Sequence, residues 1–180
     1  MLRFISIPAI ACTMGLMPIQ CEAQVYATHD RVGDVLQVVL PLAAVGLSLK
    51  NDDMEGLKEF GLSAALSEGT TEVMKYAVNS RRPDGSSHGF PSNHVSIAFV
   101  SASYVQQRYG WGPAIPMYGL AMLTGYSRVR THNHYVKDVL GGAAVGIASA
   151  AWLTHPLSDR TRAAVGYGGG GLAVHVSHQW

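Results

Sequence analysis

Charged side chains are scarce in this sequence, since Asp, Glu, Lys and Arg make up only 14% of its 180 residues. An average soluble domain contains roughly 25%. Hydrophobic residues make up 48%, which is too many for an intrinsically disordered chain. The net charge is only +1, so the chain lacks the basic field on which non-specific nucleic-acid binding depends. Disorder and nucleic-acid binding are therefore excluded, and the length predicts a single domain core.

Cysteine is also scarce, and its position favours an exported protein. Cys12 and Cys21 have neither zinc-ribbon spacing nor the spacing of a redox CxxC pair. Both lie in an apolar N-terminal stretch, where Arg3 precedes an uncharged run that leads into a Cys-Glu-Ala tripeptide. This order is typical of a signal peptide over residues 1–23, cleaved after Ala23. The alternative is that the run, which nearly reaches the length of a bilayer span, stays as an N-terminal anchor.

The remaining chain is predicted to be a helical domain over residues 24–158 with an extension over residues 159–180. In the extension, polar and apolar residues alternate after a run of glycines, which predicts a short β-hairpin. The predicted fold class is all-α: a bundle of about five core helices with, at most, this C-terminal hairpin. Hydrophobic periodicity and the positions of Pro and Gly place the helices at residues 35–49, 54–77, 95–108, 116–124 and 138–153.

The sequence leaves two relations to a membrane open. Residues 109–127 and 139–158 contain no Asp, Glu, Lys or Arg and are long enough to span a bilayer, but they are rich in small residues rather than Leu and Ile. The helix over residues 54–77 carries central charges, which cost roughly 2.5 to 3.5 kcal/mol each within a membrane. We therefore expect a compact domain that is soluble or lies against a membrane.

Acidic side chains are nearly absent from residues 75–137. This segment has seven Lys and Arg residues and four further His residues but one acid, Asp84, whereas residues 22–72 have nine acids and three bases. Such a segment suits an anion like phosphate and lacks the oxygen ligands that Mg²⁺ or Ca²⁺ needs, so we expect no metal and no other cofactor. The alternative is a solvated face that pairs with the acidic N-terminal third, which is the better interpretation for Arg81, Arg108 and Arg130 taken individually.

A first motif places two cations near the end of a helix. Lys75 precedes Arg82 by seven residues, close to two helical turns, so both cationic groups can converge. Pro83 disfavours helical geometry at Arg82. We therefore expect the Arg82 guanidinium at a helix exit, where it can bind phosphate oxygens in bidentate fashion.

A second motif, Pro91-Ser92-Asn93-His94, opens an apolar helix. Ser92 or Asn93 is the expected N-cap, which leaves backbone N–H groups and the positive end of the helix dipole for an anion. The alternative is an ordinary capped helix with an exposed histidine.

A third motif starts with Ser127-Arg128 and continues to His134 and Asp138. Residues four apart are neighbours on a helix, so Asp138 can accept the ring N–H of His134 and leave the other ring nitrogen as a nucleophile. Taken alone, such a pair is more often a surface hydrogen bond.

Together and in this order, the three motifs resemble the signature of the type 2 phosphatidic acid phosphatase superfamily, which includes lipid phosphate phosphatases, bacterial acid phosphatases and vanadium haloperoxidases. The resemblance implies an all-helical bundle. It also implies that His134 forms a phosphohistidine, that His94 protonates the leaving oxygen and later activates water, and that Asp138 supports His134. The phosphate would be held by Lys75, Arg82, Ser92, Asn93 and Arg128.

One position departs from this family pattern, because the family usually has glycine where this chain has Asn93. Asparagine tolerates left-handed backbone geometry better than other non-glycine residues. We expect the loop to keep its shape while the side chain crowds the pocket or adds a donor, which affects rate or substrate preference rather than reaction class.

The predicted function is that of a metal-independent phosphatase that hydrolyses a phosphomonoester or pyrophosphate. A phosphorylated lipid or another phosphate ester is the expected partner, at a membrane surface on the periplasmic side. The alternatives are a vanadium haloperoxidase-like enzyme, for which the chain is short, and a non-catalytic anion-binding or membrane-associated protein. These patterns specify neither the ester nor the number of chains in the assembly.

Overall fold

The computed structural model describes residues 18–157, 161–168 and 171–178, and the side chains of residues 31–157. Five helices are followed by two antiparallel strands, which confirms the predicted all-α bundle with a C-terminal hairpin. The helices are α1 (Pro18–Lys50), α2 (Met54–Val78), α3 (Asn93–Tyr109), α4 (Trp111–Arg130) and α5 (Val136–Leu153), and the strands are β1 (Thr161–Gly168) and β2 (Gly171–His178).

Four helices begin earlier than the sequence predicted: α3 and α5 by two residues each, and α4 and α1 by more. α4 starts at Trp111 rather than residue 116, because Pro113 falls in the first turn, where a backbone N–H has no helical partner to lose. α1 starts at Pro18 and continues through the predicted cleavage site after Ala23. Residues 1–17 of the predicted signal peptide lie outside the described residues.

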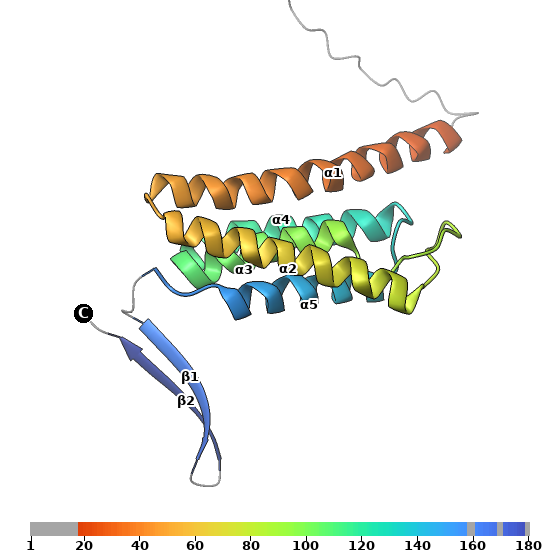
Figure 1. Ribbon diagram of the computed structural model, residues 1–180. Helices are drawn as coiled ribbons and strands as arrows, with labels where there is room; N and C mark the ends of the chain where they lie inside the picture. Colours follow the sequence, from red (N-terminus) through yellow and green to blue (C-terminus); the bar gives the residue numbers. More distant parts are fainter. Residues whose placement is uncertain (1–17, 158–160, 169–170, 179–180) are drawn as a thin grey trace, which may run out of the picture.

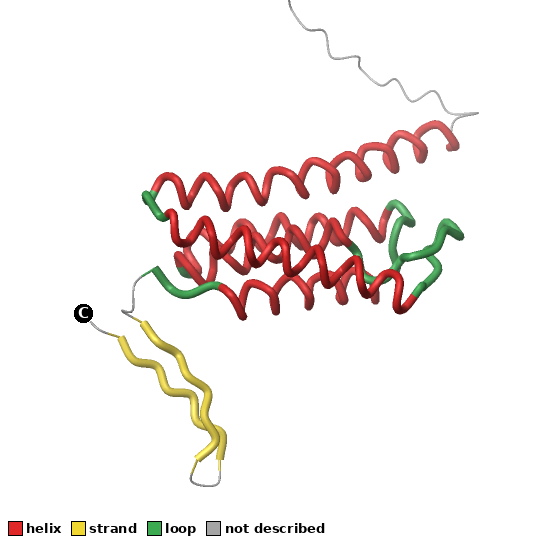
Figure 2. Tube along the Cα trace, viewed as in Figure 1, coloured by secondary structure: helices red, strands yellow, loops and turns green. Residues whose placement is uncertain are grey.

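The arrangement of the helices gathers four helix ends on one side of the molecule. α1 lies along the group formed by α2 to α5, and the hairpin projects from the end of α5 (Figure 1). The loops after α2 and after α4 lie together at one end, whereas the α1–α2 turn lies at the other end (Figure 2). The ends of α2 and α4 and the beginnings of α3 and α5 therefore meet at the same end of the bundle.

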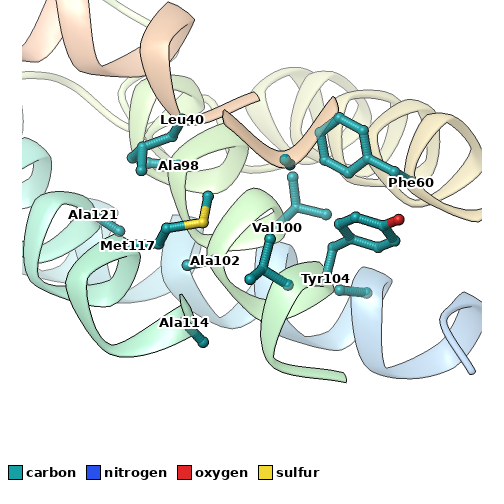
Figure 3. Packing of buried hydrophobic residues seen from close by; sticks show 12 residues of the cluster. Leu40, Phe60, Ala98, Val100, Ala102, Tyr104, Ala114, Met117 and Ala121 are labelled. Atoms are coloured by element: carbon teal, nitrogen blue, oxygen red, sulfur yellow. The ribbon is translucent and has the colours of Figure 1, made fainter. Parts of the chain in front are cut away.

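The core cluster contains side chains from all five helices (Figure 3). Leu40 from α1, Phe60 from α2 and Tyr104 from α3 are buried there, and Met117 of α4 is packed into the same cluster. Burial of a large apolar side chain contributes roughly 1.5 to 3 kcal/mol. This central cluster holds the two ends of the bundle in a fixed relation.

Glycines bring α5 close to the backbone of α3. A Cβ atom at Gly142 would collide with the carbonyl oxygen of Ser92, and one at Gly146 would lie 2.7 Å from the backbone nitrogen of Val100. The close approach allows the Ser92 N–H to donate to the Asp138 carbonyl oxygen at 3.0 Å. The first turns of α3 and α5, which carry residues of the second and third motifs, are thereby joined directly.

A buried ion-pair network closes the opposite end of the bundle. Arg108 donates to both carboxylate oxygens of Asp53, at 2.7 and 2.6 Å, and also to Glu59 at 3.2 Å. Tyr109 donates to Asp53 at 2.8 Å, and His155 lies 2.8 Å from the Glu59 carboxylate. Arg108 therefore pairs with the acidic N-terminal third, as one interpretation of the sequence expected, but it does so in the interior rather than on a solvated face.

Candidate active site

All of the residues predicted from the three motifs lie at the end of the bundle where the helix ends gather (Figure 1). The last turns of α2 and α4 carry a cation each, and the loop after α2 carries another. The first turns of α3 and α5 and the loop before α5 carry the remaining side chains. In chain order these residues are Lys75, Arg82, Ser92, Asn93, His94, Arg128, His134 and Asp138.

The loop between α2 and α3 folds back on itself and holds Arg82. The Arg82 N–H donates to the Ser86 carbonyl at 2.8 Å, and the Gly89 N–H donates to the Ser80 carbonyl at 2.7 Å. A Cβ atom at Gly89 would lie 2.9 Å from the Arg82 side chain, so glycine is needed for this close approach. The fold of the loop brings the Arg82 charge near enough to His134 to affect its ionisation.

His134 lies in the loop before α5 rather than on the helix. Its backbone N–H donates to the Arg128 carbonyl at 3.1 Å, and its side chain is buried. Nδ1 of His134 is 3.5 Å from Oδ2 of Asp138, and that oxygen accepts a hydrogen bond from the Tyr135 N–H at 2.9 Å. The proximity expected from the spacing is present, but the helical geometry expected for the pair is not, because α5 begins only at Val136.

The surroundings of His134 favour its neutral form. Burial is the main cause that lowers the pKa of His134, to about 4, and the positive charge of Arg82 lowers it further, while Asp138 acts in the opposite direction. A histidine that is neutral at pH 7 has an unprotonated ring nitrogen, which nucleophilic attack requires.

Buried polar atoms without a hydrogen-bond partner gather at this end of the described structure. Leaving such an atom unsatisfied costs roughly 1 to 3 kcal/mol, so a group of them is typical of a binding site. The Ser92 hydroxyl belongs to this group, since it stands at the N-cap of α3 without a capping hydrogen bond. The atoms are Glu68 Oε1, Arg82 Nε, Ser92 Oγ, Asn93 Oδ1, His134 Nδ1 and Asp138 Oδ1.

Asn93 occupies a helical position. It is the first residue of α3 and does not have the positive φ angle found at His88 or His132. The expectation that asparagine is useful here for left-handed geometry is therefore wrong. Its side chain instead neighbours the carboxylate of Glu68, which also lies near Lys75.

Lys75 has a carboxylate partner of its own. Its ammonium group lies 2.6 Å from the Glu72 carboxylate, one turn earlier on α2. The carboxylate of Glu68, on the same helix, also lies near Lys75. Glu68 and Glu72 together therefore partly balance the charge of Lys75.

Asp34 is a site residue that sequence reasoning missed. Its Oδ1 atom lies 3.0 Å from Nε2 of His94 and 3.2 Å from Nη1 of Arg128. In the sequence, Asp34 stands out only as one of the nine acids of residues 22–72. No local spacing connects Asp34 with His94 or Arg128, which lie far from it in the sequence. The only signal was the excess of bases in residues 75–137, which indicated acidic partners in another part of the chain.

The arrangement provides the groups needed for nucleophilic displacement at phosphorus. A neutral histidine, a second histidine and a set of cations lie on converging helix ends. Among the side chains that the structure describes, no group of three or more His, Cys, Asp or Glu is arranged to hold a metal ion. Cationic side chains can stabilise the charge on a transferring phosphoryl group.

Comparison with known proteins identifies relatives of this chain. Residues 56–162 match the family model described as the PAP2 superfamily. Lipid A 4'-phosphatase of Helicobacter pylori is 30% identical over 174 residues, which cover 84% of this chain and 85% of that protein. Lipid A 1-phosphatase of Porphyromonas gingivalis is 36% identical over 132 residues, which cover 66% of this chain but 29% of that protein.

A solved structure has the same fold. The crystal structure of Aquifex aeolicus LpxE superimposes with a TM-score of 0.62 at 21% sequence identity. The match covers 72% of this chain and 84% of that chain. The predicted helical architecture is confirmed by this comparison.

Proposed function

This chain belongs to the PAP2 superfamily and is a phosphoric ester hydrolase, and we propose that it removes a phosphate group from a membrane lipid through a phosphohistidine intermediate. Its relatives include proteins named lipid A 4'-phosphatase and lipid A 1-phosphatase, so we propose a phosphate ester of lipid A as its substrate. The observation that carries the mechanism is the buried, neutral His134 between Arg82 and Asp138.

In the first step, Nε2 of His134 attacks phosphorus, because Nδ1 faces Asp138. The N–P bond forms as the bond between phosphorus and the lipid oxygen breaks, and His94 gives its proton to the departing oxygen. The cations of Lys75, Arg82 and Arg128 spread their charge over the phosphoryl oxygens. Asp138 stabilises the positive charge that develops on the imidazole ring.

In the second step, water attacks the phosphohistidine. His94, now neutral, takes a proton from the water as its oxygen bonds to phosphorus, and the N–P bond breaks. Inorganic phosphate leaves, and His134 returns to its neutral form. The steps balance without a metal ion or any other co-reactant.

The exposed surface supports a membrane-embedded domain. Two helical segments in the described part, Arg31–Lys50 and Val136–Leu153, are long and apolar enough to cross a membrane. Large apolar side chains are exposed on α1, α2, α4 and α5. We propose that lipid covers these faces and that the site lies at the periplasmic interface, with residues 1–23 serving for export or as an anchor.

Turnover of defined lipids tests the proposal. The full-length protein in detergent micelles is given lipid A, undecaprenyl pyrophosphate, phosphatidic acid, phosphatidylglycerol phosphate or p-nitrophenyl phosphate in excess EDTA, and released phosphate is measured. We expect release from lipid A and inhibition by vanadate. His134→Ala serves as the inactive control.

Three results would contradict the proposal. Activity that is lost in EDTA and restored by Mg²⁺ would contradict the metal-independent mechanism. Vanadate-dependent oxidation of bromide without phosphate release would indicate a haloperoxidase. Phosphate binding without turnover of any ester would indicate a non-catalytic anion-binding protein.

A further inference from the structure

A carboxylate from α1 reaches into the site from outside the three motifs. A single oxygen of Asp34 lies 3.0 Å from the His94 ring nitrogen and 3.2 Å from the Arg128 guanidinium. These are the two groups that the proposed function assigns to the leaving oxygen and to the phosphate. Asp34 precedes the segment over residues 56–162 that matches the family model.

The backbone of α1 is fitted to Arg128 at this point. A Cβ atom at Gly33 would collide with the Arg128 guanidinium and with the hydroxyl of Ser127. Glycine lets the helix come this close without displacing these side chains, and the next residue then places its carboxylate on Arg128. Gly33 and Asp34 therefore act together to bring α1 against the site.

The two partners differ in their freedom to move. The side chain of Asp34 is 52% exposed, whereas that of Arg128 is 4% exposed. The carboxylate can rotate into solvent while the packing around Arg128 keeps the guanidinium in place. The contact is thus one that an incoming anion can displace.

A carboxylate and a phosphate use the same donors. Arginine and imidazole N–H groups form charge-assisted hydrogen bonds with either anion, and two anions that share these donors repel each other. We propose that Asp34 is an internal anion that competes with the phosphate group for Arg128 and His94. It contacts both side chains in the free enzyme and weakens the binding of inorganic phosphate, which favours release of the product.

This inference rests on the proposed function for the roles of His94 and Arg128, and binding of inorganic phosphate tests it independently of turnover. Titration calorimetry on the full-length protein in detergent compares wild type with Asp34→Asn, which keeps the shape and removes the charge. We expect the Kd for phosphate and the Ki for vanadate to fall about fivefold to tenfold, as expected for losing a nearby like charge. KM for the lipid substrate should fall as well.

Two further variants sharpen the test. Asp34→Ala should tighten phosphate binding in the same direction, which separates the loss of charge from any new hydrogen bond made by asparagine. Glu55→Gln removes the same charge from an exposed carboxylate in the first turn of α2, at the other end of the bundle, and should leave the Kd unchanged.

Unchanged or weaker phosphate binding in both Asp34 variants would overturn the inference, even if the wild type hydrolyses lipid phosphates. If the wild type hydrolyses no ester but both Asp34 variants bind phosphate more tightly, the proposed function is wrong. The competition between Asp34 and phosphate would still stand. Thermal unfolding of each variant, measured without phosphate, shows whether the compared proteins are equally folded.

Discussion

At the scale of single residues, the ionisation of His134 is the property on which the proposed mechanism depends. Burial and the charge of Arg82 lower its pKa to about 4 from the usual 6.5. In the proposed mechanism only the neutral ring attacks phosphorus, so kcat/KM should fall as the pH falls through about 4 and not near 6.5. The pH dependence of kcat/KM reports this ionisation in the free enzyme.

Arg82→Gln tests the origin of this pKa. The substitution removes a positive charge that disfavours protonation of His134, so the acid limb of the profile should move to higher pH while the activity falls. Arg81→Gln, which changes an exposed neighbour, should leave the position of the limb unaltered. An acid limb near 6.5 in the wild type, or one that does not respond to Arg82→Gln, would refute the assignment.

Loss of the proposed nucleophile, His134, should reduce activity more than loss of the Asp138 charge that orients it. His134→Ala should abolish hydrolysis, because no other group in the proposed mechanism attacks phosphorus. Asp138→Asn should retain a small activity, reduced about a hundredfold to ten-thousandfold, because orientation is lost while the nucleophile remains. Phosphate release under single-turnover conditions measures both, and wild-type activity in His134→Ala would rule out this residue as the nucleophile.

At the scale of elements, the close packing of α3 against α5 sets the geometry of the site. Gly146 has no room for a side chain beside the α3 backbone. Gly146→Val should therefore lower stability by about 1 to 3 kcal/mol through overpacking. It should also reduce activity in the protein that remains folded, because α3 carries His94 and α5 carries Asp138.

Gly119→Ala is the matched control for this substitution. Nothing lies within 4 Å of a Cβ atom at Gly119 in α4, so alanine should raise helix stability by up to about 1 kcal/mol. Thermal unfolding in detergent, followed by circular dichroism, compares the two. Equal stability of the Gly146 and Gly119 variants would show that the helix contact is not as close as described.

The ion-pair network around Arg108 joins α2, α3 and the segment after α5. Hydrogen bonds from Arg108 are the main cause that lowers the pKa of Asp53 to about 2 from 3.8. Because the folded-state pKa is depressed, this stabilisation is complete above pH 3.8 and is lost as the pH falls through about 2. Asp53 therefore contributes to resistance against unfolding in acid.

Arg108→Gln should destabilise the fold by about 3 to 5 kcal/mol, since it leaves buried carboxylates without their partner. Its acid-unfolding midpoint should lie at higher pH than that of the wild type. Lys58→Gln breaks an exposed ion pair with Glu55 and should change stability little. A stable Arg108 variant with an unchanged acid-unfolding midpoint would show that the network contributes nothing.

At the scale of the whole molecule, large apolar side chains are exposed on four helices, which supports the proposed contact with lipid. Trp111 at the start of α4 and Trp152 near the end of α5 are 61% and 79% exposed. Both helix ends lie opposite the site, and tryptophan is enriched at membrane interfaces. We expect both indoles to contact lipid at the membrane face away from the active site.

Fluorescence quenching by brominated phosphatidylcholine measures this contact. The protein is reconstituted in a Trp180→Phe background, so that only Trp111 and Trp152 emit. Bromines placed near the headgroup should quench more strongly than bromines near the chain ends. A protein that stays in solution without detergent and shows no quenching would contradict a membrane-embedded domain.

Local patterns in the sequence were enough to predict the helical fold and the motif residues. Helical periodicity depends on neighbours within a few positions, so the helices could be placed, apart from ends such as the start of α4. The spacing of Lys75, Arg82, His94 and His134 carried the family resemblance for the same reason. These residues lie at or near helix ends that meet at one end of the bundle, which is the arrangement that the proposed site needs.

Contacts between distant parts of the chain could be decided only by the tertiary structure. Packing of α1 against α4 places Asp34 on Arg128, and packing at the other end buries Arg108 with Asp53. The lowered pKa of His134 also arises from the folded chain, because burial and the charge of Arg82 cause it. Burial and pairing depend on which surfaces meet in space, and sequence neighbours do not encode that, whereas helix periodicity and motif spacing are encoded by neighbours alone.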